Sequence, residues 1–198
     1  MMFNTAKWTL LTTIGLAGGI VAALLVGKPL DQLVGAMVVT AILTCLVGAV
    51  LGGMQAVYLR QLLARPIWWV VATVAGVGIG LAVGVVLIEQ VGTLIAGHRP
   101  HVVQLTPALR APSFAVLGLV SGTILGFSQW LVLRRQSPRV RRWIPTTAFA
   151  LALAFSASSL LVDAFAGGIA SPVGVITFVL ASGLAFGALT SRPLRHAA

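Results

Sequence analysis

Two glutamines stand out among the few side chains of this sequence that are able to do chemistry. Gln55 lies in "GGMQAVYLR" and Gln129 in "GFSQWLVLR", and in both places an apolar stretch surrounds the amide and a Leu-Arg pair follows it. A buried amide needs a hydrogen-bond partner, because leaving it without one costs about 2 kcal/mol or more. Such a group either joins neighbouring helices or contacts a polar solute or ion.

Catalytic chemistry is not indicated by the remaining polar residues. Serines occur in "GTILGFSQ" and "SASS", but a serine nucleophile needs a base within hydrogen-bond distance. All histidines lie outside the apolar stretches, and no glycine-rich phosphate loop with its lysine is present. The sequence therefore predicts no catalytic residue, no cofactor and no cofactor-binding residue, and we expect the protein not to be an enzyme.

The histidines and the acids are the candidates for metal binding and for ion attraction. "HRPH" places His98 and His101 three residues apart, but no cysteine or nearby acid completes a metal site, so a solvated loop is expected. Asp31, Glu89 and Asp163 each follow an apolar stretch and are expected at the outer membrane interface, mostly solvated. The alternative is a ring of carboxylates that attracts cations to an external mouth.

Composition identifies the class of protein. Only 8% of the 198 residues are charged and 59% are hydrophobic, whereas a soluble domain carries about 25% charged residues. An apolar stretch of about 20 residues matches the thickness of a bilayer core. The expected fold class is all-α: a polytopic membrane protein, a single domain over residues 1–198 without a soluble domain, with six transmembrane helices at Trp8–Gly27, Leu33–Leu59, Ile67–Ile88, Phe114–Leu133, Trp143–Val162 and Pro172–Ser191.

The formal charge of +10 is distributed unevenly. If six helices alternate in direction, ten basic residues and no acid fall on one side of the membrane, and the other side is neutral. Positive charge marks the cytoplasmic side, so both termini are expected there. Anionic lipid headgroups explain this face without nucleic acid. The expected lipid-facing basic loop contains Arg134, Arg135, Arg139, Arg141 and Arg142.

A two-helix hairpin recurs along the chain. With an offset of 74 residues, Gly48, Gly52, Gln55 and Trp69 coincide with Gly122, Gly126, Gln129 and Trp143. The first helix of the unit reads W-x3-T-x2-small-x3-small, and the second reads G-x3-G-x2-Q/T-x3-L-R. Internal repeats of this kind are typical of pseudo-symmetric copies of one structural unit. The predicted copies cover residues of about 8–60, 69–134 and 143–195.

The repeat places its polar residues at one depth. Positions i, i+4, i+7 and i+11 share one face of a helix, and small residues there let helix backbones approach each other. The polar residue lies roughly 6–8 Å inside the cytoplasmic interface in each copy. This layer is interpreted as structural hydrogen bonding, with a polar vestibule for a solute or ion as the alternative: Thr12, Gln55, Thr73, Gln129, Thr147 and Thr190.

The positions of the tryptophans and of the cysteine also indicate their roles. Trp68, Trp69, Trp130 and Trp143 stand near the ends of apolar stretches, which is typical of an interfacial aromatic belt. The single cysteine, Cys45, lies in the middle of a predicted helix and cannot form an internal disulfide. It is interpreted as an inert small hydrophobic residue.

The hairpin pattern resembles that of small bacterial membrane proteins with no known activity, which carry G-x3-G-x2-Q-W/Y-x2-L-R followed by a tryptophan that opens the next helix. The resemblance runs through Gly48–Thr73 and Gly122–Thr147 and implies a multi-pass protein of the bacterial inner (plasma) membrane. Six helices in about 200 residues also resemble the substrate-binding subunits of vitamin transporters, but only at the level of fold.

These observations favour a non-catalytic accessory or scaffolding protein. Its expected partners are the anionic lipids of the cytoplasmic side and either a second copy of itself or a larger membrane complex. The alternative is a small-solute transporter subunit or a channel that uses the Gln/Thr layer. The two hypotheses differ in whether that layer is dry and mutually bonded or lines a cavity.

Overall fold

The structure is a computed structural model that describes residues 4–34, 36–96, 107–134, 140, 142–165 and 171–195. Over these residues it is all-helical, and the prediction of six helices, each long and apolar enough to cross a membrane, is confirmed. The helices are α1 (Thr5–Val34), α2 (Ala36–Leu59), α3 (Ile67–Ala96), α4 (Pro107–Leu133), α5 (Trp143–Phe165) and α6 (Pro172–Arg195).

The helix ends follow local sequence signals. Asn4 caps α1, since its side-chain oxygen accepts a hydrogen bond from the Lys7 backbone N–H at 3.0 Å. Ser171 caps α6 in the same way through the Gly174 N–H at 2.9 Å, and Pro172 occupies the first helical position. α1 and α3 continue beyond their predicted ends to Val34 and Ala96, because a helix need not stop where its apolar stretch stops.

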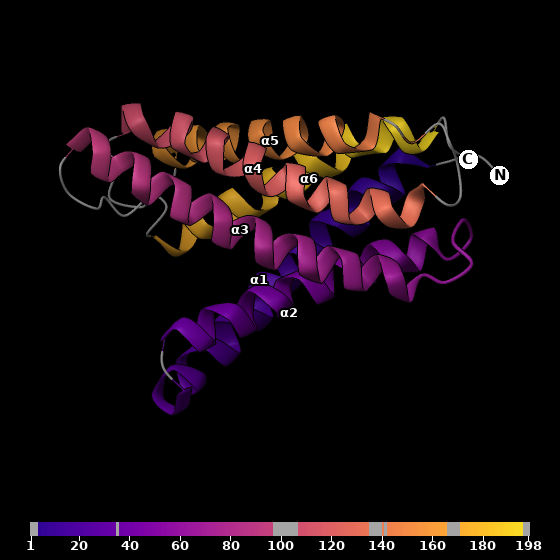
Figure 1. Cartoon of the computed structure of the whole chain (residues 1–198), viewed down its shortest axis with the longest axis horizontal. Helices are drawn as coiled ribbons and strands as arrows, with labels where there is room; N and C mark the ends of the chain where they lie inside the picture. Colours follow the sequence, from indigo (N-terminus) through magenta and orange to yellow (C-terminus); the bar gives the residue numbers. More distant parts are fainter. Residues whose placement is uncertain are drawn as a thin grey trace.

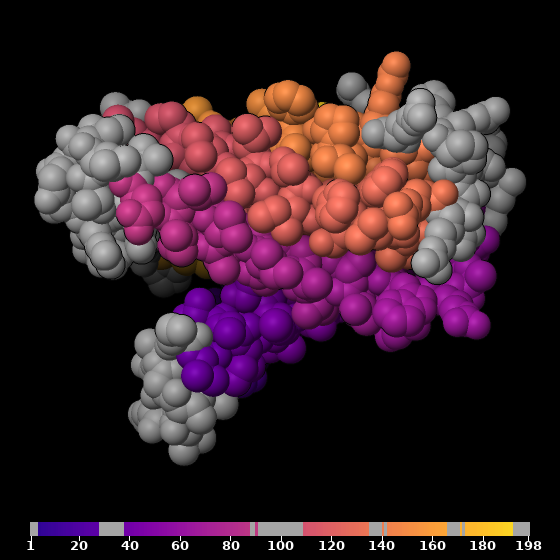
Figure 2. All heavy atoms as spheres, in the orientation of Figure 1, coloured from indigo at the N-terminus to yellow at the C-terminus, as the bar shows by residue number. Residues whose placement is uncertain are grey.

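The helices form a closed ring in chain order. Each helix packs against its neighbours in sequence, and α1 also packs against α6. Figure 1 shows α1 beginning and α6 ending at the same end of the bundle. Away from that end, the α1–α2 hairpin diverges from the other helices. Figure 2 shows the surface hollowed between this indigo hairpin and the neighbouring magenta helix α3.

The hairpins α1–α2, α3–α4 and α5–α6 pack against one another through glycines. In each case the glycine lies on the second helix of one hairpin and contacts the first helix of the next around the ring. A Cβ added to Gly48 of α2 would lie 2.8 Å from the Cα of Val74 in α3. The corresponding contacts are from Gly122 of α4 to the Cα of Ala148 in α5, and from Gly183 of α6 to the Cα of Thr13 in α1, both at 2.8 Å. Only glycine permits such backbone approach in the membrane.

Within the first two hairpins, glycines of the first helix make a second set of close contacts. A Cβ on Gly15 of α1 would lie 3.0 Å from the Cα of Leu51 in α2, and one on Gly76 of α3 would lie 2.7 Å from the Cα of Leu125 in α4. In the third hairpin, Ala150 of α5 packs in a cluster with Phe186 of α6. Small residues therefore lie where helices approach each other, both within the hairpins and between them.

Candidate functional site

The polar layer predicted from the sequence lies inside the ring and excludes solvent. Gln55 of α2 is 1% exposed, and its amide nitrogen donates a hydrogen bond to the hydroxyl of Thr12 in α1 at 3.3 Å. Its amide oxygen accepts a hydrogen bond from the indole Nε1 of Trp69 in α3 at 3.1 Å. One glutamine therefore joins three helices.

Gln129 repeats this arrangement one hairpin later. Its amide nitrogen donates to the hydroxyl of Thr73 in α3 at 3.0 Å, and its amide oxygen accepts from the indole Nε1 of Trp143 in α5 at 3.2 Å. The Thr73 hydroxyl donates in turn to the backbone carbonyl of Trp69 at 2.9 Å. The two glutamine sites are thus parts of one continuous hydrogen-bond network from α1 to α5.

A shorter version of the network closes the ring between α1 and α6. The indole Nε1 of Trp8 donates to the hydroxyl of Thr190 at 3.1 Å, and that hydroxyl donates to the backbone carbonyl of Phe186 at 2.8 Å. Thr147, the remaining residue of the predicted layer, donates to the backbone carbonyl of Trp143 at 2.8 Å. All six residues of the layer are buried, and every one of these hydroxyls or amides is engaged within the protein.

The interpretation of Trp69 and Trp143 as members of an interfacial aromatic belt is wrong. Both are buried, and Trp69 packs edge-to-face against Trp8 and Trp143, with ring centroids 6.5 and 5.7 Å apart. These three residues, named here the tryptophan cluster, lie near the starts of α1, α3 and α5. They turn inward because the neighbouring Gln and Thr side chains offer their indole N–H groups acceptors. Trp68, by contrast, is 55% exposed.

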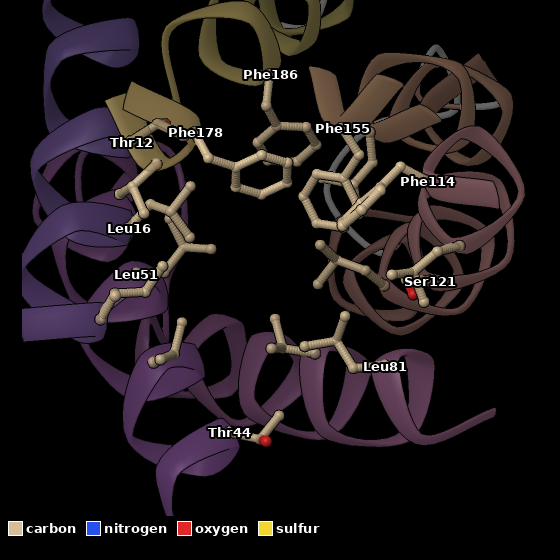
Figure 3. Close-up of a pocket in the computed structure, with 17 residues that line it drawn as sticks. Thr12, Leu16, Thr44, Leu51, Leu81, Phe114, Ser121, Phe155, Phe178 and Phe186 are labelled. Atoms are coloured by element: carbon tan, nitrogen blue, oxygen red, sulfur yellow. The ribbon is translucent and has the colours of Figure 1, made fainter. Parts of the chain in front are cut away.

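A central cavity of about 310 Å³ adjoins this layer, and side chains of all six helices line it. Figure 3 shows four phenylalanines on one side of the cavity, Phe114, Phe155, Phe178 and Phe186, with Leu51 and Leu16 opposite. The lining is almost wholly apolar. Of the six polar-layer residues only Thr12 contributes to it, so the glutamine amides do not face this space.

The predicted outer carboxylates have different outcomes. Asp163 of α5 forms an ion pair with Arg110 of α4, and its side chain is only 16% exposed, so the expectation that it is mostly solvated is wrong. The two groups are 53 residues apart in sequence, and the apolar surroundings favour pairing because an isolated charge there would be costly. The side chains of Asp31 and Glu89 lie outside those that the structure describes.

Removing one partner of this ion pair should destabilise the protein. Arg110→Met leaves the Asp163 carboxylate without its cation in a mostly apolar environment, and we expect a loss of about 2 kcal/mol of unfolding free energy, less than for a fully buried pair. The double variant Arg110→Met/Asp163→Leu should recover most of that loss. Unfolding titrations with SDS in mixed micelles measure both. A double variant less stable than the single one would contradict this account.

Apart from Arg110, the basic residues whose side chains the structure describes lie exposed at the end of the bundle where α1 begins: Lys7, Arg60, Arg65, Arg134 and Arg142. The Arg134 guanidinium stacks over the Trp130 ring, with 5.1 Å between the guanidinium carbon and the ring centroid. Arg135, Arg139 and Arg141 of the predicted lipid-facing loop lie outside the described residues, as does the "HRPH" segment.

Metal-binding clusters are absent from the part of the chain that the structure describes, since no three His, Cys, Asp or Glu side chains lie close enough to share an ion. Cys45 is exposed on the outside of α2. Cys45 therefore contributes to neither the polar layer nor the cavity.

Six long apolar helices indicate a multi-pass membrane protein. No protein-family model matches the chain, and no curated protein or solved structure is significantly similar to it. The features of the molecule that bear on function are the polar layer, the tryptophan cluster and the cavity.

Proposed function

We propose that the ring consists of three pseudo-repeated hairpins in a bacterial inner membrane, with both termini in the cytoplasm. The glycine contacts support the repeat, since a Cβ added to Gly48, Gly122 or Gly183 would in each case lie 2.8 Å from a Cα of the adjoining hairpin. The exposed basic residues at the end where α1 begins support the orientation, because positive charge favours the cytoplasmic side.

Within this frame, we propose a non-catalytic accessory or scaffolding role in which the protein packs with itself or with a larger membrane complex. The observation that carries the proposal is the closed hydrogen bonding of Gln55 and Gln129. Both amides use their donor and their acceptor on neighbouring helices. Polar groups that are bonded in this way fix helix register, and at 1% exposure neither amide is open to a polar solute.

One observation favours the alternative of a small-solute transporter subunit or channel, namely the cavity inside the ring. A path for a polar solute needs polar groups that replace its water shell. Here the lining is almost wholly apolar, and the hydroxyl of Thr12 accepts a bond from Gln55. The cavity is therefore weak support for the passage of polar solutes.

Replacing Gln129 with leucine distinguishes the scaffolding role from the transporter or channel. If the amide is structural, Gln129→Leu lowers the unfolding free energy by about 1 kcal/mol, because the Trp143 N–H loses its acceptor and the Thr73 hydroxyl loses the bond that it accepts from Gln129. Proteoliposomes containing wild type or variant should then show the same background flux of small sugars, amino acids and cations. Gln90→Leu is the control, since Gln90 is exposed near the far end of α3.

Extraction of wild-type membranes with a nanodisc-forming polymer tests the scaffolding role directly. We expect particles that contain more than one polypeptide chain, measured by native mass spectrometry. Particles containing a single 20.5 kDa chain would contradict that role. Solute flux in wild-type liposomes that Gln129→Leu abolishes at unchanged stability would instead support the transporter subunit or channel.

A further inference from the structure

The lining of the cavity is chemically similar to hydrocarbon. Its walls are phenylalanine, leucine, isoleucine and valine side chains from all six helices, and three hydroxyls interrupt them. Ser121 donates to the Gly80 carbonyl at 3.0 Å and Thr44 to the Thr40 carbonyl at 2.6 Å, while Thr12 accepts from Gln55. These hydroxyls are used within the protein, so the lining favours a guest without polar groups.

The cavity is also large enough to hold an apolar ligand. Apolar cavities about half as large stay free of water and take up benzene-sized molecules. At 310 Å³, this one is near the lower limit of the pockets that hold larger ligands. Water would find almost no hydrogen-bond partners there, and an empty space would leave the lining side chains without contacts.

Two aromatic clusters limit how a guest enters. The tryptophan cluster lies with the buried glutamines at the end where α1 begins. Towards the other end, the rings of Phe114, Phe155 and Phe178 pack together at centroid distances of 5.3 to 6.4 Å on the α4–α5–α6 side. Phenylalanine rings therefore form one side of the cavity, and the tryptophan cluster lies outside its lining, at the end of the bundle where α1 begins.

An approach from the bilayer lies between α2 and α3. These helices touch where Gly48 and Gly52 meet Val74 and Val70, and beyond that contact the hairpin diverges and the surface is hollowed (Figure 2). Thr44 and Leu81 line the cavity from α2 and α3 (Figure 3). Next to them, Ile42 and Val85 are exposed apolar residues, 41% and 38% exposed.

We propose that the cavity holds one acyl chain of a bilayer phospholipid, which enters sideways between α2 and α3 while its headgroup stays at the membrane surface. Phospholipid tails are present at this depth in vast excess over any other apolar molecule. An acyl chain is also narrow and lacks polar groups, as the lining requires. Such a lipid site is compatible with either proposed function.

Photo-crosslinking in nanodiscs tests the proposal. The full chain is reconstituted with a trace of phosphatidylcholine that carries a diazirine midway along one acyl chain, and cross-links are located by mass spectrometry. We expect labelling of the lining residues Leu81 and Phe155 in addition to the lipid-facing Leu153, which is 58% exposed. Labelling confined to outward-facing residues would overturn the proposal.

A cavity-filling substitution provides the matched comparison. Val77→Phe extends a lining residue into the cavity, whereas Ile79→Phe, two residues away, changes a side chain that is 56% exposed to lipid. Labelling at Phe155 should fall at least fivefold in Val77→Phe and stay unchanged in Ile79→Phe. Leu16→Phe and its exposed neighbour Ile14→Phe repeat the comparison from α1, in case the first variant does not fold.

A second arm distinguishes the source of the hydrocarbon. Nanodiscs receive a free fatty acid with the same diazirine in place of the labelled phospholipid. Weak labelling of Phe155 by the free acid, at least fivefold below that by the phospholipid, is the expected result. Labelling of Phe155 by the free acid that equals or exceeds the phospholipid signal would show that a detached apolar molecule occupies the cavity, and would overturn the phospholipid assignment.

Discussion

Replacing Trp69 with alanine should reduce the unfolding free energy by about 3–5 kcal/mol, the range for removing a large buried aromatic side chain. Trp69 is fully buried, and its ring packs against both Trp8 and Trp143. Its indole N–H also donates to Gln55 at 3.1 Å, so the variant leaves that amide oxygen without its donor. Loss of one side chain therefore disturbs the contacts of all three hairpins.

Trp68→Ala is the matched control for that experiment, because Trp68 is the adjacent residue and is 55% exposed. Its effect should stay within about 0.5 kcal/mol, as for other surface substitutions. Trp69→Phe should fall between the two, since it keeps an aromatic ring but removes the donor to Gln55. SDS unfolding titrations of the four proteins provide the comparison. Equal losses for Trp68→Ala and Trp69→Ala would refute the buried tryptophan cluster.

The helices and the bonding of the two glutamines could be predicted from the sequence. Six apolar stretches of bilayer length determine the number of helices, and Ile67, Trp143 and Pro172 begin helices as expected. Each glutamine shares a helix face with two glycines, which requires a close neighbouring helix, and a buried amide must bond to that neighbour. Local spacing carries all of this information.

The indole N–H groups that donate to the two amide oxygens were not predicted. A tryptophan at the start of an apolar helix fits both an interfacial belt and a buried position, and hydropathy does not separate the two. One signal was present in the sequence. Trp69 follows Gln55 by 14 residues, and Trp143 follows Gln129 by the same number. A fixed separation between two scarce residue types indicates contact across the short connection between α2 and α3 or between α4 and α5.

The ion pair and the cavity could not be predicted from spacing. Arg110 and Asp163 are 53 residues apart and lie on helices whose relative rotation is set by packing with Gly118 and Gly122. The cavity depends on the side-chain volumes that six helices bring to the centre of one ring. A repeat pattern shows which faces meet, but not whether the space between them is filled.

The glycine contacts lead to the second large effect. Gly52→Leu should lower the unfolding free energy by about 3 kcal/mol, the upper end of the usual range for overpacking. A Cβ at Gly52 already lies 2.9 Å from the Cβ of Thr73 and 3.1 Å from the Cα of Val70. The remaining leucine atoms must therefore push α2 away from α3, and the displacement would also stretch the bond between Gln55 and Trp69.

Gly53→Leu, one residue further along α2, is the matched control, because a Cβ at Gly53 meets nothing within 4 Å. Leucine there removes a poor helix former and should leave stability unchanged or raise it by about 0.5 kcal/mol. The expected order of stability is therefore Gly53→Leu at or above wild type and Gly52→Leu far below. If Gly52→Leu were as stable as Gly53→Leu, α2 and α3 would not pack through this glycine, and the polar layer would lose the close helix contact that aligns it.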